Sequence, residues 1–243
     1  MRILLLGGTS EARALAAQLY PDVEVISSLA GRVPDPALPV GQVRIGGFGG
    51  ADGLRNWLRE NGVDAVVDAT HPFAATMTAT AATVCRELGV PHLVLVRPAW
   101  APGDAIVVAS DTEAAETVAD KRFSRVFLTT GRSGTAAFKD VDAWFLIRAV
   151  TPPDPQDLPR HHHVLLSRGP YGYDGELALL REHRIDAVVT KNSGGAMTRP
   201  KLDAAAALGV AVVMVDRPPL PSGVQTVGTT DEAVAWVSAV STR

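Results

Sequence analysis

One pattern of residues occurs twice in this chain and constrains its fold more than any other feature. In the first copy, Asp64-Ala65-Val66-Val67 precedes a Leu-Gly-Val triplet that ends at Val90, and then Arg97. In the second copy, Asp186-Ala187-Val188-Val189 precedes the same triplet and then Arg217. Seven positions separate the last valine of the triplet from the arginine in both copies. Chance reuse of one αβ connection would give the same pattern, but we interpret it as two related α/β halves.

Short apolar runs alternate with longer helical patterns along the chain, which is typical of parallel sheets covered by helices. A hydrophobic fraction of 47% with only 5% aromatic residues agrees with strands built from Val, Leu, Ile and Ala. Two prolines and a glycine interrupt the alternation at 98–103. We therefore predict two Rossmann-like halves with parallel sheets, 1–100 and 104–243, and a ligand cleft between them. The strands are expected at 3–6, 23–26, 43–45, 65–67, 93–96, 126–128, 144–147, 164–166, 187–189 and 212–215.

Composition and charge exclude several classes of function. A net charge of −3 provides no broad positive field for nucleic acid. The apolar N-terminal run reaches Gly7 too soon for a signal peptide, and no run has the length of about 20 apolar residues that a membrane helix needs. The single cysteine, Cys85, fits a reducing compartment. We expect a cytoplasmic protein without membrane or nucleic-acid partners, and the sequence carries no signal for an oligomeric state.

A glycine-containing loop follows the first expected strand and opens a helix. In Leu6-Gly7-Gly8-Thr9-Ser10-Glu11-Ala12, glycine allows close approach of a phosphate, and a helix N-terminus offers unpaired N–H groups. Threonine stands where the dinucleotide fingerprint has its middle glycine. We predict that the cofactor contacts Gly7, Gly8, Thr9, Ser10 and Glu11. The alternative is a tight turn with a Ser or Thr N-cap.

The end of the second expected strand indicates which dinucleotide would bind. Enzymes that bind NAD usually have Asp or Glu there, which binds the ribose hydroxyl groups. This chain has Ser27-Ser28-Leu29-Ala30-Gly31-Arg32 instead. Hydroxyl groups and an arginine suit a 2′-phosphate, so we predict NADPH, bound by Ser27, Ser28 and Arg32. A loop without a ligand is the alternative.

The run Asp68-Ala69-Thr70-His71-Pro72-Phe73-Ala74 follows a buried strand. Thr70 is expected to contact the cofactor. His71 is the candidate catalytic residue, as a proton donor or as a hydrogen-bond donor to a carboxylate. Alternatively, Asp68 or His71 only stabilises the turn.

Basic and small polar residues recur in the second half. Guanidinium groups bind carboxylates through paired hydrogen bonds, so a ligand with several carboxylates is expected. Each cation by itself would be interpreted as a surface charge. Adjacent histidines at 161–163 alternate in direction along a strand, and we predict no metal site. The expected substrate-binding residues are Arg132, Arg148, Tyr171, Lys191 and Ser193.

Taken together and in this order, these motifs resemble the precorrin-6A reductase family. The resemblance also rests on Gly46-Gly47-Phe48-Gly49, Thr129-Thr130-Gly131-Arg132, Gly169-Pro170-Tyr171 and Thr190-Lys191-Asn192-Ser193-Gly194-Gly195. Asn192 departs from the acidic residue that we expect in many relatives. The resemblance implies hydride transfer from NADPH to one C=C bond of precorrin-6A, a tetrapyrrole with acetate and propionate arms, to give precorrin-6B in cobalamin biosynthesis.

Two other functions are compatible with the residues. One is a tetrapyrrole-binding synthase or cyclase of two α/β halves that uses no nucleotide, like uroporphyrinogen III synthase. The other is an NADPH reductase of a small metabolite, which would need few arginines for carboxylates. The sequence does not indicate whether the macrocycle carries cobalt.

Overall fold

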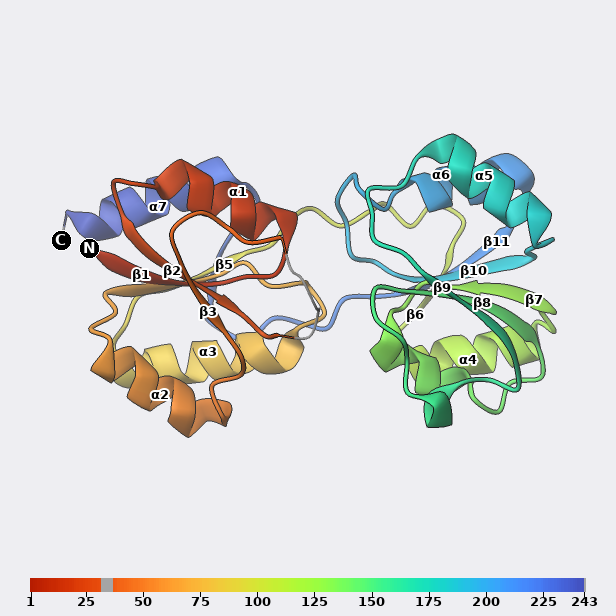
Figure 1. Ribbon diagram of the computed structural model, residues 1–243, viewed down its shortest axis with the longest axis horizontal. Coiled ribbons are helices and arrows are strands. Elements are labelled where there is room, and N and C mark those ends of the chain that lie inside the picture. The colour runs from red at the N-terminus through yellow and green to blue at the C-terminus, as the bar shows by residue number, and fades with distance from the viewer. Residues whose placement is uncertain (32–36, 243) are drawn as a thin grey trace. The chain divides into compact units, whose positions relative to one another are not determined.

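The chain forms two compact units, each an α/β sandwich with one parallel sheet (Figure 1). The structure is a computed structural model that describes residues 1–31 and 37–242. Unit 1 consists of Met1–Pro98 and the C-terminal segment that begins at Pro218, and unit 2 is Ala99–Arg217. The predicted fold class, two α/β halves with parallel sheets, is confirmed.

The sheet of unit 1 has the strand order β12-β5-β4-β1-β2-β3. Helices α1 and α7 pack together on one face, and α2 and α3 pack together on the other (Figure 1). Its elements are β1 (Arg2–Leu6), α1 (Ser10–Leu19), β2 (Glu24–Leu29), β3 (Gln42–Ile45), α2 (Gly50–Glu60), β4 (Ala65–Asp68), α3 (Ala75–Leu88), β5 (His92–Leu95), β12 (Gln225–Val227) and α7 (Thr230–Ser241).

The sheet of unit 2 has the order β6-β11-β10-β7-β8-β9. Helices α5 and α6 pack on one face, and α4 lies with the 3-10 segment η1 on the other (Figure 1). Its elements are β6 (Ile106–Val108), α4 (Asp111–Asp120), β7 (Arg125–Leu128), η1 (Arg132–Phe138), β8 (Trp144–Ala149), η2 (Pro155–Asp157), β9 (His161–Leu166), α5 (Tyr173–Glu182), β10 (Ala187–Lys191), α6 (Pro200–Leu208) and β11 (Ala211–Val215).

The central strands are apolar on both sides because helices cover both faces of each sheet. Ile3 and Leu5 of β1 pack against α1 and α7, while Leu4 and Leu6 pack on the side of α2 and α3. All four side chains are buried. This layering directs the carboxyl ends of all the strands in a unit to one edge, where open α/β sheets bind ligands.

The repeated pattern in the sequence corresponds to repeated structure. Asp64 accepts a hydrogen bond from the backbone N–H of Arg2 at 2.7 Å, at the start of β1. Asp186 accepts one from the backbone N–H of Arg125 at 3.0 Å, at the start of β7. The glycine of each Leu-Gly-Val triplet ends a helix in the left-handed conformation, with φ of 67° after α3 and 64° after α6. The two halves are therefore related.

The predicted boundary of the second half, 104–243, is wrong at its C-terminal end. Strand β12 pairs with β5, and α7 packs against α1, so this βα segment belongs to unit 1. The corresponding segment β6–α4 follows β5 in the chain, yet β6 pairs with β11 of unit 2. Each sheet thus takes its sixth strand from the other repeat. The chain passes between the units twice, at 98–99 and at 217–218, and both crossings lie at an Arg-Pro pair: the first directly after Arg97-Pro98 and the second between Arg217 and Pro218.

Within the described residues, no helix has the length and apolar character needed to cross a bilayer.

Candidate functional site

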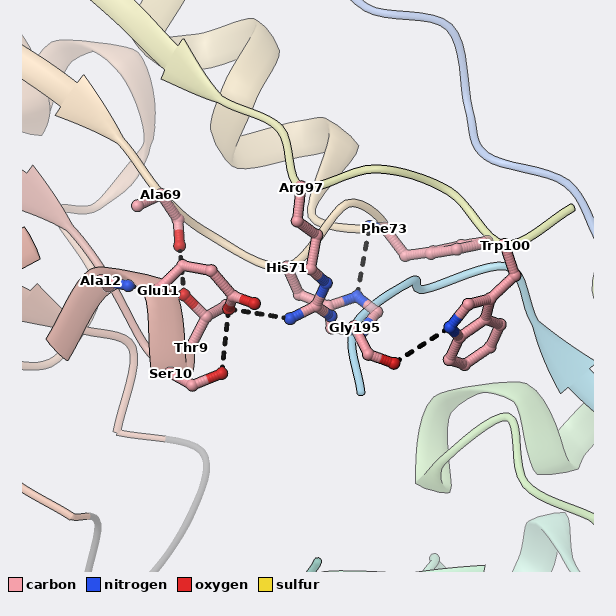
Figure 2. A network of polar contacts seen from close by, with 10 residues as sticks. All are labelled: Thr9, Ser10, Glu11, Ala12, Ala69, His71, Phe73, Arg97, Trp100 and Gly195. Carbon is pink, nitrogen blue, oxygen red and sulfur yellow. Dashed lines mark hydrogen bonds and ion pairs between the residues drawn. The ribbon is translucent and has the colours of Figure 1, made fainter. Parts of the chain in front are cut away.

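At the carboxyl edge of unit 1, Thr9 joins the first loop to the end of β4. Its hydroxyl group donates to the carbonyl oxygen of Ala69 at 2.7 Å and accepts from the N–H of Ala12 at 3.1 Å (Figure 2). Thr9 is buried and is the N-cap of α1. The N-cap alternative for this loop is therefore correct for Thr9. The loop is held rigidly, with Gly8 exposed at a φ of 109° that favours glycine.

Glu11 has partners inside unit 1. Its carboxylate forms an ion pair with Arg97 at 2.9 Å and accepts from the hydroxyl group of Ser10 at 3.0 Å (Figure 2). Burial opposes ionisation of Glu11, but its own backbone N–H and the charge of Arg97 outweigh burial and hold its pKa below the ordinary value. The carboxylate thus satisfies an N–H at the helix N-terminus. This geometry assigns Glu11 to holding the loop in shape through its contacts with Ser10 and Arg97.

A small pocket lies between this loop and β2. The residues that line it include Gly7, Gly8, Ser27, Arg13 of α1 and Pro39. The hydroxyl oxygen of Ser27 is buried and has no hydrogen-bond partner among the described residues. An unsatisfied buried hydroxyl group is costly unless a ligand or water completes its hydrogen bond. The predicted cofactor residues Gly7, Gly8 and Ser27 therefore meet at one pocket.

Arg44 of β3 is a cation at this edge that sequence reasoning missed. It lies opposite Ser28 in the register of β2 and β3, and its Nη1 donates to the Ser28 hydroxyl group at 3.1 Å. The sequence signal was an arginine inside a short expected strand, two residues before the Gly46-Gly47-Phe48-Gly49 motif. Arg32, the cation that we predicted for this place, lies outside the described residues.

Asp68 organises the turn that carries Thr70 and His71. One carboxylate oxygen accepts from both the N–H and the hydroxyl group of Thr70, at 2.9 and 2.7 Å. The Nδ1 atom of His71 accepts from the N–H of Phe73 at 3.3 Å (Figure 2). In a neutral imidazole this hydrogen bond assigns the proton to Nε2. His71 is exposed, so it can present that N–H to a ligand.

In unit 2, three of the predicted substrate residues follow strands. Arg132 is exposed at the start of η1, just after β7. Lys191 ends β10 and forms an ion pair with Asp111 at 3.1 Å, and the N–H of Ser193 donates to the carbonyl oxygen of Lys191 at 2.7 Å. Lys191 therefore already has a carboxylate partner from α4, a contact that the sequence did not reveal.

The prediction for Arg148 is not supported by its position. Its guanidinium is 8% exposed and forms an ion pair at 2.7 Å with Glu176 of α5, which is 3% exposed. Its carbon Cζ lies 3.9 Å from the centroid of the Tyr171 ring and 4.6 Å from that of Phe127. A buried, paired guanidinium stacked on aromatic rings is a structural element of the core. Tyr171 contacts Arg148 and donates to the carbonyl oxygen of Ser167 at 3.0 Å.

A second buried cation, Lys201 of α6, lies beside this pair. It is 5% exposed, its Nζ donates to the carbonyl oxygen of Thr198 at 2.8 Å, and it lies 4.7 Å from the ring centroid of Trp100. Burial lowers its pKa to about 7; Glu176 opposes this shift and Arg148 adds to it. Lysine was not predicted here because α6 shows no distinct polar pattern around it.

We expect Lys201 to make the stability of the protein depend on pH. Its pKa is lowered in the folded state, so the unfolded chain binds more protons between about pH 7 and the ordinary lysine pKa. Stability is therefore lost as the pH falls through this window and gained as it rises, by at most about 1.4 kcal/mol per pH unit. Denaturant unfolding of the unaltered chain and of Lys201→Met from pH 7 to 9 measures this. Their difference in unfolding free energy should grow with pH, whereas for the exposed Lys139→Met it should stay constant; a constant difference for both contradicts the expectation.

Asn192 has a structural role in unit 2. Its side-chain oxygen accepts from the N–H of Trp100 at 2.9 Å, and its amide nitrogen donates to the carbonyl oxygen of Trp100 at 3.2 Å. The Nε of Arg217 donates to the backbone carbonyl oxygen of Asn192 at 2.8 Å, and the Trp100 indole donates to Gly195 (Figure 2). An aspartate could not make both side-chain contacts. Asn192 thus joins the segments with which the chain enters and leaves unit 2.

Comparison with known proteins identifies close relatives. The family model for the precorrin-6x reductase CbiJ/CobK matches residues 2–238. A precorrin-6A reductase of Mycobacterium tuberculosis (strain ATCC 25618 / H37Rv) is 67% identical over 242 residues, covering 100% of this chain and 99% of the relative. One of Rhodococcus erythropolis is 56% identical, with 100% and 99% covered. The solved structure of a CobK precorrin-6A reductase matches with a TM-score of 0.89 and 38% identity, covering 99% of this chain and 97% of that one.

Proposed function

The chain belongs to the precorrin-6x reductase family CbiJ/CobK, and from this premise we propose that it uses NADPH to reduce one C=C bond of precorrin-6A. The product is precorrin-6B, an intermediate of cobalamin biosynthesis. A relative that is 67% identical and carries the name precorrin-6A reductase supports this substrate, and we propose the macrocycle without cobalt. We also propose that the reaction takes place in the cytoplasm.

The observation that carries the choice of a nucleotide is the pocket beside Ser27. Its glycine wall lets a ligand approach the backbone, and the Ser27 hydroxyl group lacks a partner among the described residues. The carboxyl ends of β1 and β2 are where a Rossmann fold binds the ribose and phosphates of a dinucleotide. When bound, NADPH supplies the hydride. The residues of unit 1 bind and orient it: Gly7, Gly8, Ser10, Ser27, Ser28 and Thr70 by contact, with Thr9 and Glu11 holding the loop in shape.

Unit 2 is proposed to bind the carboxylate arms of the substrate. Arg132, Lys191 and Ser193 are at the carboxyl edge of its sheet, where cations and hydroxyl groups can pair with acetate and propionate. Lys191 would exchange its contact with Asp111 for one with substrate. Arg148, paired with Glu176, supports the site from the core by packing against the Tyr171 ring rather than by binding a carboxylate of the substrate. These residues contribute binding and orientation of the substrate.

The function is tested by NADPH oxidation with precorrin-6A and with cobalt-precorrin-6A as substrates. We expect oxidation with the former, and we expect Arg32→Ala to weaken binding of NADPH by about ten- to a hundred-fold, since a charge-assisted hydrogen bond contributes about 1.5–3 kcal/mol. Binding of NADH should change little because it has no 2′-phosphate. Arg59→Ala, which removes an exposed arginine of α2, is the control.

Three results would contradict parts of this proposal. Equal losses for NADPH and NADH in Arg32→Ala would show that Arg32 does not read the 2′-phosphate. Oxidation with the cobalt-containing macrocycle alone would correct the substrate. A chain that binds the tetrapyrrole but neither nucleotide would be a tetrapyrrole-binding protein that uses no nucleotide, and the reductase assignment would fail.

A further inference from the structure

Arg44 reaches past the end of its own strand to the end of the neighbouring one. It faces Ser28 in the register of β2 and β3, and its Nη1 donates to the Ser28 hydroxyl group at 3.1 Å. The same nitrogen donates to the carbonyl oxygen of Gly46 at 2.7 Å, and Nη2 donates to that of Gly47 at 2.9 Å. The guanidinium therefore lies at the carboxyl edge of the sheet, where β2 and β3 end.

The guanidinium is held in place by an aromatic ring as well as by these hydrogen bonds. Its carbon Cζ lies 3.8 Å from the centroid of the Phe48 ring, which itself contacts Trp57 of α2 edge-on at 5.5 Å. Gly53 permits this packing, because a Cβ on Gly53 would lie 1.7 Å from the carbonyl oxygen of Phe48. Such support fixes the orientation of a cation before any ligand arrives, which lowers the entropic cost of binding.

The charge of Arg44 has no carboxylate partner among the ion pairs of the described residues. Its hydrogen bonds there use Nη1 twice and Nη2 once, all with neutral oxygens. A guanidinium has five N–H donors, so donors on Nε and Nη2 remain for a ligand. These two nitrogens form the edge of the guanidinium that binds phosphate in a bidentate manner. Burial lowers the pKa of Arg44, as expected for a partly desolvated cation without a counter-ion.

We infer that Arg44 forms an ion pair with the 2′-phosphate of the cofactor and so selects NADPH over NADH. The inference rests on the proposed function. Rossmann folds bind the adenosine ribose at the end of the second strand, and Arg44 contacts Ser28 at that strand end. Gly31, two residues after β2, lies against Ile45 and Gly46 at the end of β3, next to the carbonyl oxygen of Gly46 that Arg44 contacts.

Direct binding tests the inference without turnover. NADPH and NADH are titrated by the fluorescence of their reduced nicotinamide, and adenosine 2′,5′-bisphosphate is used as a competitor. Arg44→Gln should weaken NADPH and the bisphosphate about ten- to a hundred-fold and NADH less than about two-fold. Arg44→Lys keeps the charge and should retain part of the preference. Arg59→Gln, with the same change in net charge on exposed α2, should leave all three affinities unchanged.

Other outcomes overturn the inference in distinguishable ways. If Gln and Lys at position 44 weaken NADPH and NADH equally, Arg44 only holds the 46–49 loop. If Arg44→Gln binds both as the unaltered chain does, another cation reads the phosphate while the proposed function stands. If the unaltered chain binds neither nucleotide, the proposed function fails as well. Should Arg44→Gln not fold, Arg44→Lys still decides: loss of the bidentate edge should weaken NADPH and the bisphosphate but not NADH, and an unchanged preference for NADPH overturns the inference.

Discussion

Replacing Glu176 by glutamine should lower the free energy of unfolding by about 3–5 kcal/mol. Arg148 and Glu176 are both buried, and their 2.7 Å contact compensates the cost of removing the guanidinium from water. The variant leaves that guanidinium charged, because arginine does not lose its proton in proteins. Lys201, in contrast, can lose its proton, since burial lowers its pKa to about 7. Denaturant unfolding at constant pH measures the loss.

Two further variants test whether the loss of stability comes from breaking the buried ion pair or from any change of charge. The double replacement Arg148→Met with Glu176→Leu removes both charges, and its stability should lie close to that of the unaltered chain, because apolar residues often substitute for a buried pair at no cost. The exposed pair of Arg199, the N-cap residue of α6, and Asp203 is the control, and Asp203→Asn should change stability by less than about 1 kcal/mol. A loss below about 1 kcal/mol in Glu176→Gln would mean that the pair contributes no more than a surface pair, and that the Arg148 charge tolerates the loss of its partner.

The layered α/β fold was predictable because it depends on local patterns. Apolar runs of strand length, and glycine in the left-handed conformation after α3 and α6, can be recognised from neighbouring residues alone. The exchanged strands were not predictable in this way. The β6–α4 and β12–α7 segments carry similar caps, with Ser110 and Thr229 accepting from the N–H groups of Glu113 and Glu232. Which sheet each joins depends on the edge strand it meets, and no local pattern encodes that.

In the candidate site, too, features with a local sequence pattern were predictable, and contacts between distant residues were not. The loop at Gly7 and Gly8 was found because a phosphate-binding turn has a local signature. The partners of charged residues were not found, because Arg148 and Glu176 are 28 positions apart and Arg44 meets Ser28 only through strand register. Both Arg132 and Arg148 lie near a strand end, so the sequence predicted ligand contact for both. Arg132 is exposed, however, and Arg148 is buried.

The largest effect on turnover is expected at His71. Replacing it by alanine should lower kcat by about 10²–10⁴-fold if it donates the proton that completes the reduction. Its Nδ1 accepts from the N–H of Phe73, so the neutral ring carries its proton on Nε2 and can donate a hydrogen bond there. Transfer of a proton requires the imidazolium form, in which Nδ1 is protonated and gives up its contact with Phe73. Affinity for NADPH should change little, because the measured loss concerns proton transfer rather than binding. Steady-state turnover and NADPH titration of the same preparation report the two quantities.

The pH dependence of turnover identifies the role of His71 more specifically than the size of the loss in kcat does. A proton-donating histidine makes kcat fall at high pH, where the ring no longer carries the proton that it must donate, and His71→Ala should lack that limb of the profile. His71→Gln keeps a polar side chain but cannot donate a proton in this range, so it should behave like alanine. His161→Ala, an exposed histidine of β9, should retain the full profile. If His71→Ala turns over nearly as fast as the unaltered chain with the same profile, the substrate or solvent supplies the proton, and His71 only shapes the turn that Asp68 and Thr70 begin.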